Sequence, residues 1–225
     1  MPLAAHQLAF LGQIIPAAVE ACVARGVPPQ VCVAQAVFES GWGKSAPYYN
    51  YFGLHGTGND GSFVAVTAEY TGTAKDGGLK AVKVPFAKYK TPADGVAAYA
   101  ERVTGGTFSG STAYADDPAA FVVFIWGRGY ATDIDYPAHI AQVGHSIANH
   151  SKELPDGPFR AFAESCRIGF TPELAAVVKQ LQAVPAGTQR RKLTTALMPE
   201  AAKAAKGGSG WGWAAAAAAA AILWG

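Results

Sequence analysis

The sequence predicts a mainly helical α+β fold, in which one β-hairpin forms a small lobe beside several helices. Helix-start signals with proline in the first turn recur along the chain, at residues 28–29, 91–92 and 117–118. Residues 62–86 instead alternate along two strand-like runs, which flank a K-D-G-G turn. Helices on both sides of one hairpin are typical of an α+β domain.

Two helices are expected before the hairpin. The first is predicted to open at Pro16 and to run through Val23, and the second to open at residues 28–29, in the run P-P-Q-V-C-V-A-Q-A-V-F-E-S. Gly41 follows this run, and glycine commonly ends a helix because it adopts the left-handed conformation easily. The second helix therefore carries Glu39 in its last turn.

The hairpin and three later helices follow in order. Alternation in S-F-V-A-V-T-A-E-Y places Glu69 on the same strand face as Phe63 and Thr67, and Val64, Val66 and Tyr70 on the other face. The later helices are expected to start at Thr91-Pro92, at Asp117-Pro118 and at Asp135. After the last of these starts, apolar side chains recur at helical spacing: Tyr136, Ile140, Val143 and Ile147.

Composition divides the 225 residues into three parts. Residues 1–151 are aromatic, turn-rich and well patterned, as expected of a packed domain. Residues 152–206 are rich in alanine and punctuated by proline, which predicts a helical linker. Residues 207–225 are a Gly/Ser spacer followed by an apolar tail rich in alanine and tryptophan.

Charge and cysteine content exclude several classes of protein. With 18 basic and 16 acidic residues the net charge is +2, without the dense basic patch that dominates nucleic-acid binding, so no nucleic-acid partner is expected. Cys22, Cys32 and Cys166 have no metal-ligand spacing and fit small core residues. The histidines His55, His139, His145 and His150 are also scattered without ligand spacing, so no metal is expected. No other cofactor is expected either. The first residues lack the features of a Sec-type signal peptide, which predicts that any export uses another route or phage-mediated release.

Glu39 is unusual because the end of a helix is where a carboxylate is least favoured. The negative end of the helix dipole and partial burial among Phe38, Trp42 and Phe52 should both disfavour its charged form. A carboxylic acid that keeps its proton near neutral pH can protonate the leaving oxygen of a glycosidic bond. Glu69 offers a second acid from the hairpin, on the other side of the expected cleft.

Five motifs occur in sequence: A-Q-A-V-F-E-S-G-W-G-K-S, N-Y-F-G-L, T-A-E-Y, P-F-A-K-Y-K-T-P-A-D-G-V-A-A-Y and G-Y-A-T-D-I-D-Y. Together, from about Phe10 to Ile147, they resemble family 73 of the glycoside hydrolases, bacterial endo-β-N-acetylglucosaminidases that include flagellar-rod peptidoglycan hydrolases and phage lysins. The resemblance implies a lysozyme-like fold that cuts the glycan strands of peptidoglycan at the cell wall, in the periplasm or outside the cell. The residues it implies for the site are the general acid Glu39, the second carboxylate Glu69, the lining residue Tyr130, and Trp42, Asn50 and Phe52, which would shape the site.

The sequence leaves two routes open for the reaction and more than one function open for the protein. Glu69 could activate a water and invert the sugar, or the substrate's own 2-acetamido oxygen could attack the anomeric carbon. The resemblance implies cleavage that leaves N-acetylglucosamine at the new reducing end. A lytic transglycosylase or a muramidase would use the same fold and acid on the other linkage, and a non-catalytic wall-binding module would keep the fold alone.

The C-terminal tail predicts weak membrane association. Trp213 and Trp224 are 11 residues apart, about 16 Å as a helix, which is too short to cross a hydrocarbon core of roughly 30 Å. Tryptophans at the interface, with Lys203 and Lys206 near anionic headgroups, would hold the tail on the surface. The alternatives are an unstructured tail without this role and a protein whose main function lies at the membrane.

Overall fold

A computed structural model describes residues 2–71 and 78–206, and gives only the backbone for residues 68–71, 78–80 and 204–206. Within these residues, eight α-helices and one antiparallel hairpin follow the predicted order. They are α1 (Ala5–Val23), α2 (Pro29–Ser40), β1 (Ser62–Thr71), β2 (Gly78–Ala87), α3 (Pro92–Thr104), α4 (Pro118–Gly127), α5 (Tyr136–Asn149), α6 (Pro158–Ser165), α7 (Pro172–Gln182) and α8 (Thr188–Lys206).

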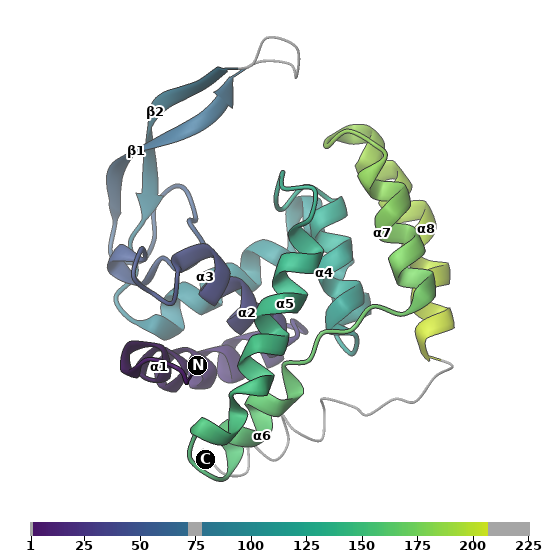
Figure 1. Ribbon diagram of the computed structural model, residues 1–225. Helices are drawn as coiled ribbons and strands as arrows, with labels where there is room; N and C mark the ends of the chain where they lie inside the picture. Colours follow the sequence, from purple (N-terminus) through teal and green to yellow (C-terminus); the bar gives the residue numbers. More distant parts are fainter. Residues whose placement is uncertain (1, 72–77, 207–225) are drawn as a thin grey trace.

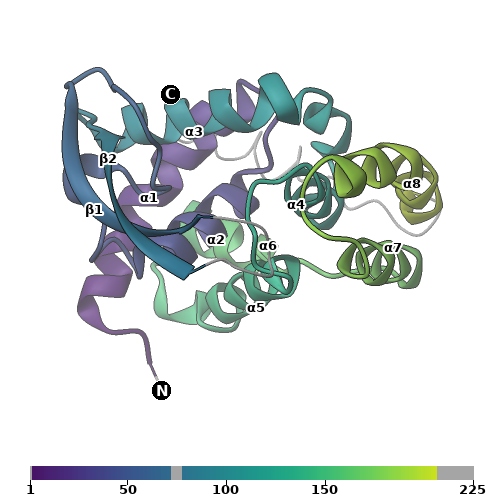
Figure 2. The same ribbon diagram turned by 90° about the horizontal axis from the view of Figure 1, so that it is seen from above.

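Helix α2 lies at the centre of the helical body. It contacts α1, α4, α5 and α6, which surround it in Figures 1 and 2. Its small and apolar side chains allow this close packing, and every residue from Pro29 to Val37 is buried. Two buried residues of α2 before Ser40 are polar, Gln30 and Gln35, and both form hydrogen bonds. Gln30 donates to Ser165 of α6, and Gln35 donates to Tyr136 of α5.

The predicted helix starts after the hairpin are confirmed. Thr91 caps α3 by accepting a hydrogen bond from the backbone N–H of Asp94, and Asp117 caps α4 through the N–H of Ala120. Asp135 precedes α5, as expected. Helix α4 is buried on all sides from Ala119 to Gly127, which explains why its sequence is apolar without periodicity.

The predicted start of α1 is wrong. The helix begins at Ala5, and Pro16 lies in its interior, where it removes one backbone hydrogen bond. Core packing on both sides of Pro16 offsets this loss, because Ile14, Ile15, Ala17 and Ala18 are all buried. Among the described residues, α1 is also the one helix whose length and apolar composition would suffice to cross a membrane. Here it contributes to the core against α2 and α3.

The hairpin stands out from one end of the helical body (Figure 1). Its register pairs Phe63 with Phe86 and Glu69 with Lys80. The two phenylalanine rings stack at 5.7 Å near the base of the hairpin, whereas Val64 and Val66 on the opposite face are about two-thirds exposed. The expected K-D-G-G turn lies largely outside the described residues.

Residues 152–206 contain helices α6, α7 and α8, whose buried side chains pack against the helical body. Helices α7 and α8 lie against each other and against α4, on the side of the helical body away from the hairpin (Figure 2). Their buried side chains, among them Leu174, Leu181 and Met198, belong to the same core cluster as α2 and α4. The alanine-rich composition hides this role because only a few large apolar residues per helix face the core. The spacer and tail at 207–225 lie outside the described residues.

Candidate active site

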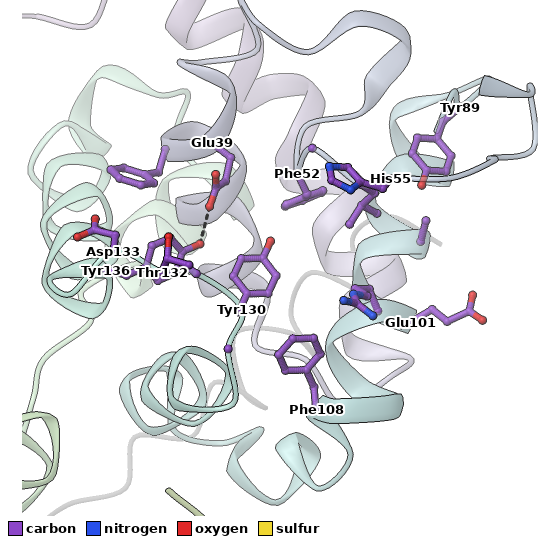
Figure 3. A pocket seen from close by; sticks show the side chains of 17 residues that line it. Glu39, Phe52, His55, Tyr89, Glu101, Phe108, Tyr130, Thr132, Asp133 and Tyr136 are labelled. Carbon is purple, nitrogen blue, oxygen red and sulfur yellow. Dashed lines mark hydrogen bonds between the residues drawn. The ribbon is translucent and has the colours of Figure 1, made fainter. Parts of the chain in front are cut away.

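A cleft of about 880 Å³ opens between the end of α2 and the base of the hairpin. Its walls come from the end of α2, residues 52–55, one face of α3, residues 129–133 and the first residue of α5 (Figure 3). This volume lies within the range of sites for ligands of the size of a few sugar rings. Glu39 and Tyr130 both point into this cleft (Figure 3).

A tight turn places Glu39 at the edge of the cleft. Gly41, Trp42 and Gly43 have φ values of 56°, 63° and 78°, so the chain reverses immediately after α2. Ser40 stabilises the turn, because its hydroxyl donates to the carbonyl of Ala36 and accepts the N–H of Gly43 at 2.8 Å. The E-S-G-W-G motif thus has a structural reason: it ends the central helix directly after the acid.

The environment of Glu39 favours its protonated form. Removal from water by the surrounding side chains raises its pKa above the ordinary 4.5, and the negative charge of Asp133 raises this pKa further. The Tyr136 hydroxyl opposes both effects by donating a 2.7 Å hydrogen bond to Oε1 of the carboxyl group. Glu39 nevertheless remains open to solvent at the cleft, which gives a substrate access to it.

Asn50 organises the wall of the cleft that faces α2. It is 5% exposed, and its amide donates to the carbonyls of Leu54 and Ala87 while its oxygen accepts the N–H of Leu54. These bonds fix residues 50–54 against the end of β2. Phe52 then lines the cleft with its ring stacked on Tyr99 at 4.1 Å. Asn50 itself is not among the residues that line the cleft.

Tyr130 lines the cleft. Its hydroxyl is buried and has no hydrogen-bond partner among the described residues. Burial raises the pKa of Tyr130 well above its usual value, and the charge of Glu39 adds to this shift, so the hydroxyl stays neutral. Tyr130 therefore adds a neutral aromatic side chain to the wall of the cleft.

Trp42 and Glu69 were also expected at the site. Trp42 is half-buried against the core and is not among the residues that line the cleft. The backbone of Glu69 is in β1 opposite Lys80, and its side chain lies outside the described part of the structure.

The structure adds cleft residues that the sequence did not single out. Asp133 lines the cleft, accepts the N–H of Asp135 and pairs with His139 at 2.8 Å. His139 stacks on Phe38, one residue before Glu39. Tyr136 was assigned only to the apolar face of a helix, although it contacts the acid. Asp133 follows Tyr130 closely in G-Y-A-T-D, and this proximity in the motif was the signal that could have identified it.

The described residues contain no group of three or more His, Cys, Asp or Glu side chains that could hold a metal ion. Cys22, Cys32 and Cys166 are free and buried, which confirms that they are small core residues. The site therefore presents an acid with a raised pKa, aromatic walls and a neutral tyrosine hydroxyl. A helical body with a hairpin lobe and an acid at the end of its central helix defines the lysozyme-like class of glycoside hydrolase domains.

Within that class, residues 15–149 match the glucosaminidase family model, described as mannosyl-glycoprotein endo-beta-N-acetylglucosaminidase. The chain belongs to this family. The match confirms the resemblance inferred from the five motifs, and it covers nearly the same residues. It ends just before the last helices, α6–α8.

Individual relatives agree with the family. Peptidoglycan hydrolase FlgJ of Salmonella typhimurium is 30% identical over 161 residues, which are 68% of this chain and 50% of that protein. A probable N-acetylmuramidase of Lactococcus lactis subsp. cremoris is 46% identical over 66 residues, 28% of this chain and 15% of that protein. The chain thus spans half or less of the length of these two curated relatives.

Two solved structures share the fold. The catalytic domain of the autolysin Auto from Listeria monocytogenes has a TM-score of 0.55 and 27% identity, covering 65% of this chain and 86% of that one. A peptidoglycan hydrolase from Sphingomonas sp. A1 has a TM-score of 0.52 and 27% identity, covering 67% and 96%. These similarities confirm the α+β, lysozyme-like fold.

Proposed function

We propose that this protein is a peptidoglycan hydrolase that cleaves the β-1,4 bond between N-acetylglucosamine and N-acetylmuramic acid and leaves N-acetylglucosamine at the new reducing end. One observation carries the proposal: Glu39 is open to the cleft while its surroundings raise its pKa. The family match and the names of the relatives support peptidoglycan as the substrate and the cell wall as the place of action.

In the proposed reaction Glu39 is the general acid. The oxygen that leaves the anomeric carbon is a poor leaving group until it is protonated, and a raised pKa favours the form of Glu39 that carries the required proton. Tyr130 contributes a neutral aromatic side chain to the wall of the cleft that holds Glu39. Phe52, fixed by its stacking on Tyr99, provides an apolar face for a sugar ring.

Two routes complete the cleavage, and both keep Glu39 as the acid. In one, Glu69 activates a water molecule from the opposite face of the sugar. In the other, the 2-acetamido oxygen attacks the anomeric carbon. The names of the relatives include both a peptidoglycan hydrolase and a probable N-acetylmuramidase, so the bond itself needs a direct test.

The test is a digest of purified peptidoglycan, reduced with borohydride and analysed by mass spectrometry. We expect reduced N-acetylglucosamine ends from the full chain and none from Glu39→Gln, which keeps the shape of the side chain but lacks the acid proton. Reduced N-acetylmuramic acid ends would identify a muramidase, and 1,6-anhydro ends a lytic transglycosylase. The absence of new ends from the wild type would favour a non-catalytic wall-binding module.

A further inference from the structure

Behind Glu39, a chain of hydrogen bonds runs through the interior from α2 to α5 and α3. Tyr136 donates from its hydroxyl to Oε1 of Glu39 at 2.7 Å. Gln35, one turn before Glu39 on α2, donates from Nε2 to the Tyr136 hydroxyl at 2.8 Å. Tyr99 on α3 donates from its hydroxyl to Oε1 of Gln35.

The three residues behind Glu39 are isolated from water. Gln35 and Tyr99 are 0% exposed and Tyr136 is 1% exposed. Buried polar groups need partners, and here these three residues supply them to one another. The helices that carry them all belong to the core, so the chain of bonds has a fixed geometry.

The chemistry of the donors gives the chain a direction. A glutamine amide accepts only at its oxygen and donates only at its nitrogen, and a tyrosine has one proton to donate. Because Tyr99 donates to the Gln35 oxygen, Gln35 presents its nitrogen to Tyr136. The Tyr136 oxygen therefore accepts from Gln35, and its single proton is directed to Oε1 of Glu39.

This direction decides which Glu39 oxygen can carry the acid proton. Oε1 already accepts from Tyr136, as the dashed line in Figure 3 shows, so the proton of the neutral acid belongs on Oε2. If the Gln35 amide were turned around, the chain would reverse. Glu39 would then donate its proton to Tyr136, and that proton would not be available to a substrate.

We propose that Tyr99, Gln35 and Tyr136 are positioning residues that keep the acid proton of Glu39 on Oε2, where it can be transferred to the leaving oxygen of the sugar. The inference rests on the proposed role of Glu39 as general acid. It adds an internal relay of residues, two of which, Gln35 and Tyr99, do not line the cleft.

Other titratable and charged groups line the cleft with Glu39. From the segment before α5 these are Asp133, whose charge raises the Glu39 pKa and which pairs with His139, and Tyr130. From α3 they are Glu101 and Arg102, and from the opposite wall His55 and Tyr89. None of these groups changes in the variants below, so a difference between variants reports the relay alone.

The decisive variant is Tyr136→Phe in the full chain. It removes a donor that stabilises the Glu39 carboxylate, so the Glu39 pKa should rise and the alkaline limb of the kcat profile should move to higher pH. We expect kcat to fall about tenfold, because the acid is no longer held in place, with KM nearly unchanged. A limb that moves to lower pH would mean that the chain runs in the reverse direction, and this would overturn the proposal.

Gln35→Met and Tyr51→Phe provide the comparison. Gln35→Met keeps most of the side-chain volume and removes the donor to Tyr136, so the alkaline limb of its kcat profile should also move to higher pH. The double variant Gln35→Met with Tyr136→Phe should have a kcat no lower than that of Tyr136→Phe alone. Tyr51→Phe is the matched control, because it removes a buried tyrosine's bond to Gln13 at 3.1 Å, away from the relay. If Tyr136→Phe and Gln35→Met lower the Tm but leave the pH limb where the control has it, the relay is only structural.

A measurement without substrate separates this proposal from the proposed function. The Glu39 carboxyl titration, followed by carbon-13 NMR in wild type and Tyr136→Phe, should show a higher pKa in the variant even if the protein cuts no peptidoglycan. Tyr99→Phe, which removes only the far end of the relay, serves if Tyr136→Phe does not fold, and it should raise the Glu39 pKa less. An unchanged Glu39 titration in the folded variants would refute the relay, whatever the activity.

Discussion

Glu39 combines a position that disfavours negative charge with access to a cleft. Desolvation and Asp133 raise its pKa, and the Tyr136 bond lowers it, so its titration is a balance between burial and one hydrogen bond. The same balance affects stability, because a group whose pKa differs between the folded and unfolded states makes stability depend on pH.

The sign of this effect can be tested with Glu39→Gln. Because the folded-state pKa is raised, the protonated acid fits the site, and the associated stability is full below the unfolded pKa near 4.5 and is lost as pH rises through the folded pKa. We therefore expect the Tm of Glu39→Gln relative to wild type to increase with pH across this window. Glu20→Gln, at an exposed glutamate of α1, is the control for losing one carboxylate, and a pH-independent Tm difference for Glu39→Gln would contradict the raised pKa.

Glu69 remains a prediction as the second carboxylate. We expect Glu69→Gln to reduce activity less than Glu39→Gln, whose loss should be about 10²–10⁴-fold. Rescue by azide would indicate that Glu69 normally activates water, since a small nucleophile can replace that step, whereas a loss without rescue would favour attack by the acetamido group. Activity equal to the wild type would leave Glu69 a structural role in the hairpin.

At the scale of single elements, the turn after α2 decides where the acid lies. Gly43 has a φ of 78°, and a Cβ atom there would lie 2.6 Å from the Phe10 ring. We expect Gly43→Ala to cost about 2–4 kcal/mol of the free energy of unfolding, through left-handed strain and overpacking. Gly12→Ala in α1 meets no neighbour within 4 Å and should be neutral or stabilising by about 0.5–1 kcal/mol. Equal Tm values for the two variants would show that the turn is not strained.

At the scale of the whole molecule, α7 and α8 contribute side chains to the same hydrophobic core as the other helices. Leu181 of α7 is fully buried in the cluster that also holds α2 and α4. We expect Leu181→Ala to lower the free energy of unfolding by about 2–5 kcal/mol. The variant should still unfold in a single transition, at a lower Tm, and activity should be lost in that same transition. Gln180→Ala, at an exposed position next to it, should stay within about 0.5 kcal/mol. Loss of α7 and α8 in a separate, earlier transition would instead support a linker that folds independently of the catalytic domain.

The tail at 207–225 is predicted to hold the protein weakly on a membrane surface. Deletion of these residues should reduce binding to vesicles that contain anionic lipid, because it removes Trp211, Trp213 and Trp224. Hydrolysis of soluble glycan fragments should not change, since the cleft lies in the part of the chain that the structure describes. Vesicle binding that is the same with and without the tail would rule out this role.

Local chemistry made much of the fold predictable. Proline next to Thr91 and Asp117 correctly predicted the starts of α3 and α4, and Gly41 predicted the end of α2. Alternation of side chains predicted the hairpin. These signals work because caps, turns and periodicity depend on neighbouring residues. The same rule failed at Pro16, where the local signal for a helix start is outweighed by core packing along α1.

By itself, the sequence determined the family, the order of the elements and the position of Glu39 at the end of a helix. Only the tertiary structure decided what Glu39 meets: Tyr136, which bonds to it, is 97 residues away in the chain, and Tyr99 joins through Gln35 from a third helix. It also decided that Asn50 braces the wall and that α7 and α8 complete the core. These contacts depend on how distant segments pack, which no local pattern of residues encodes.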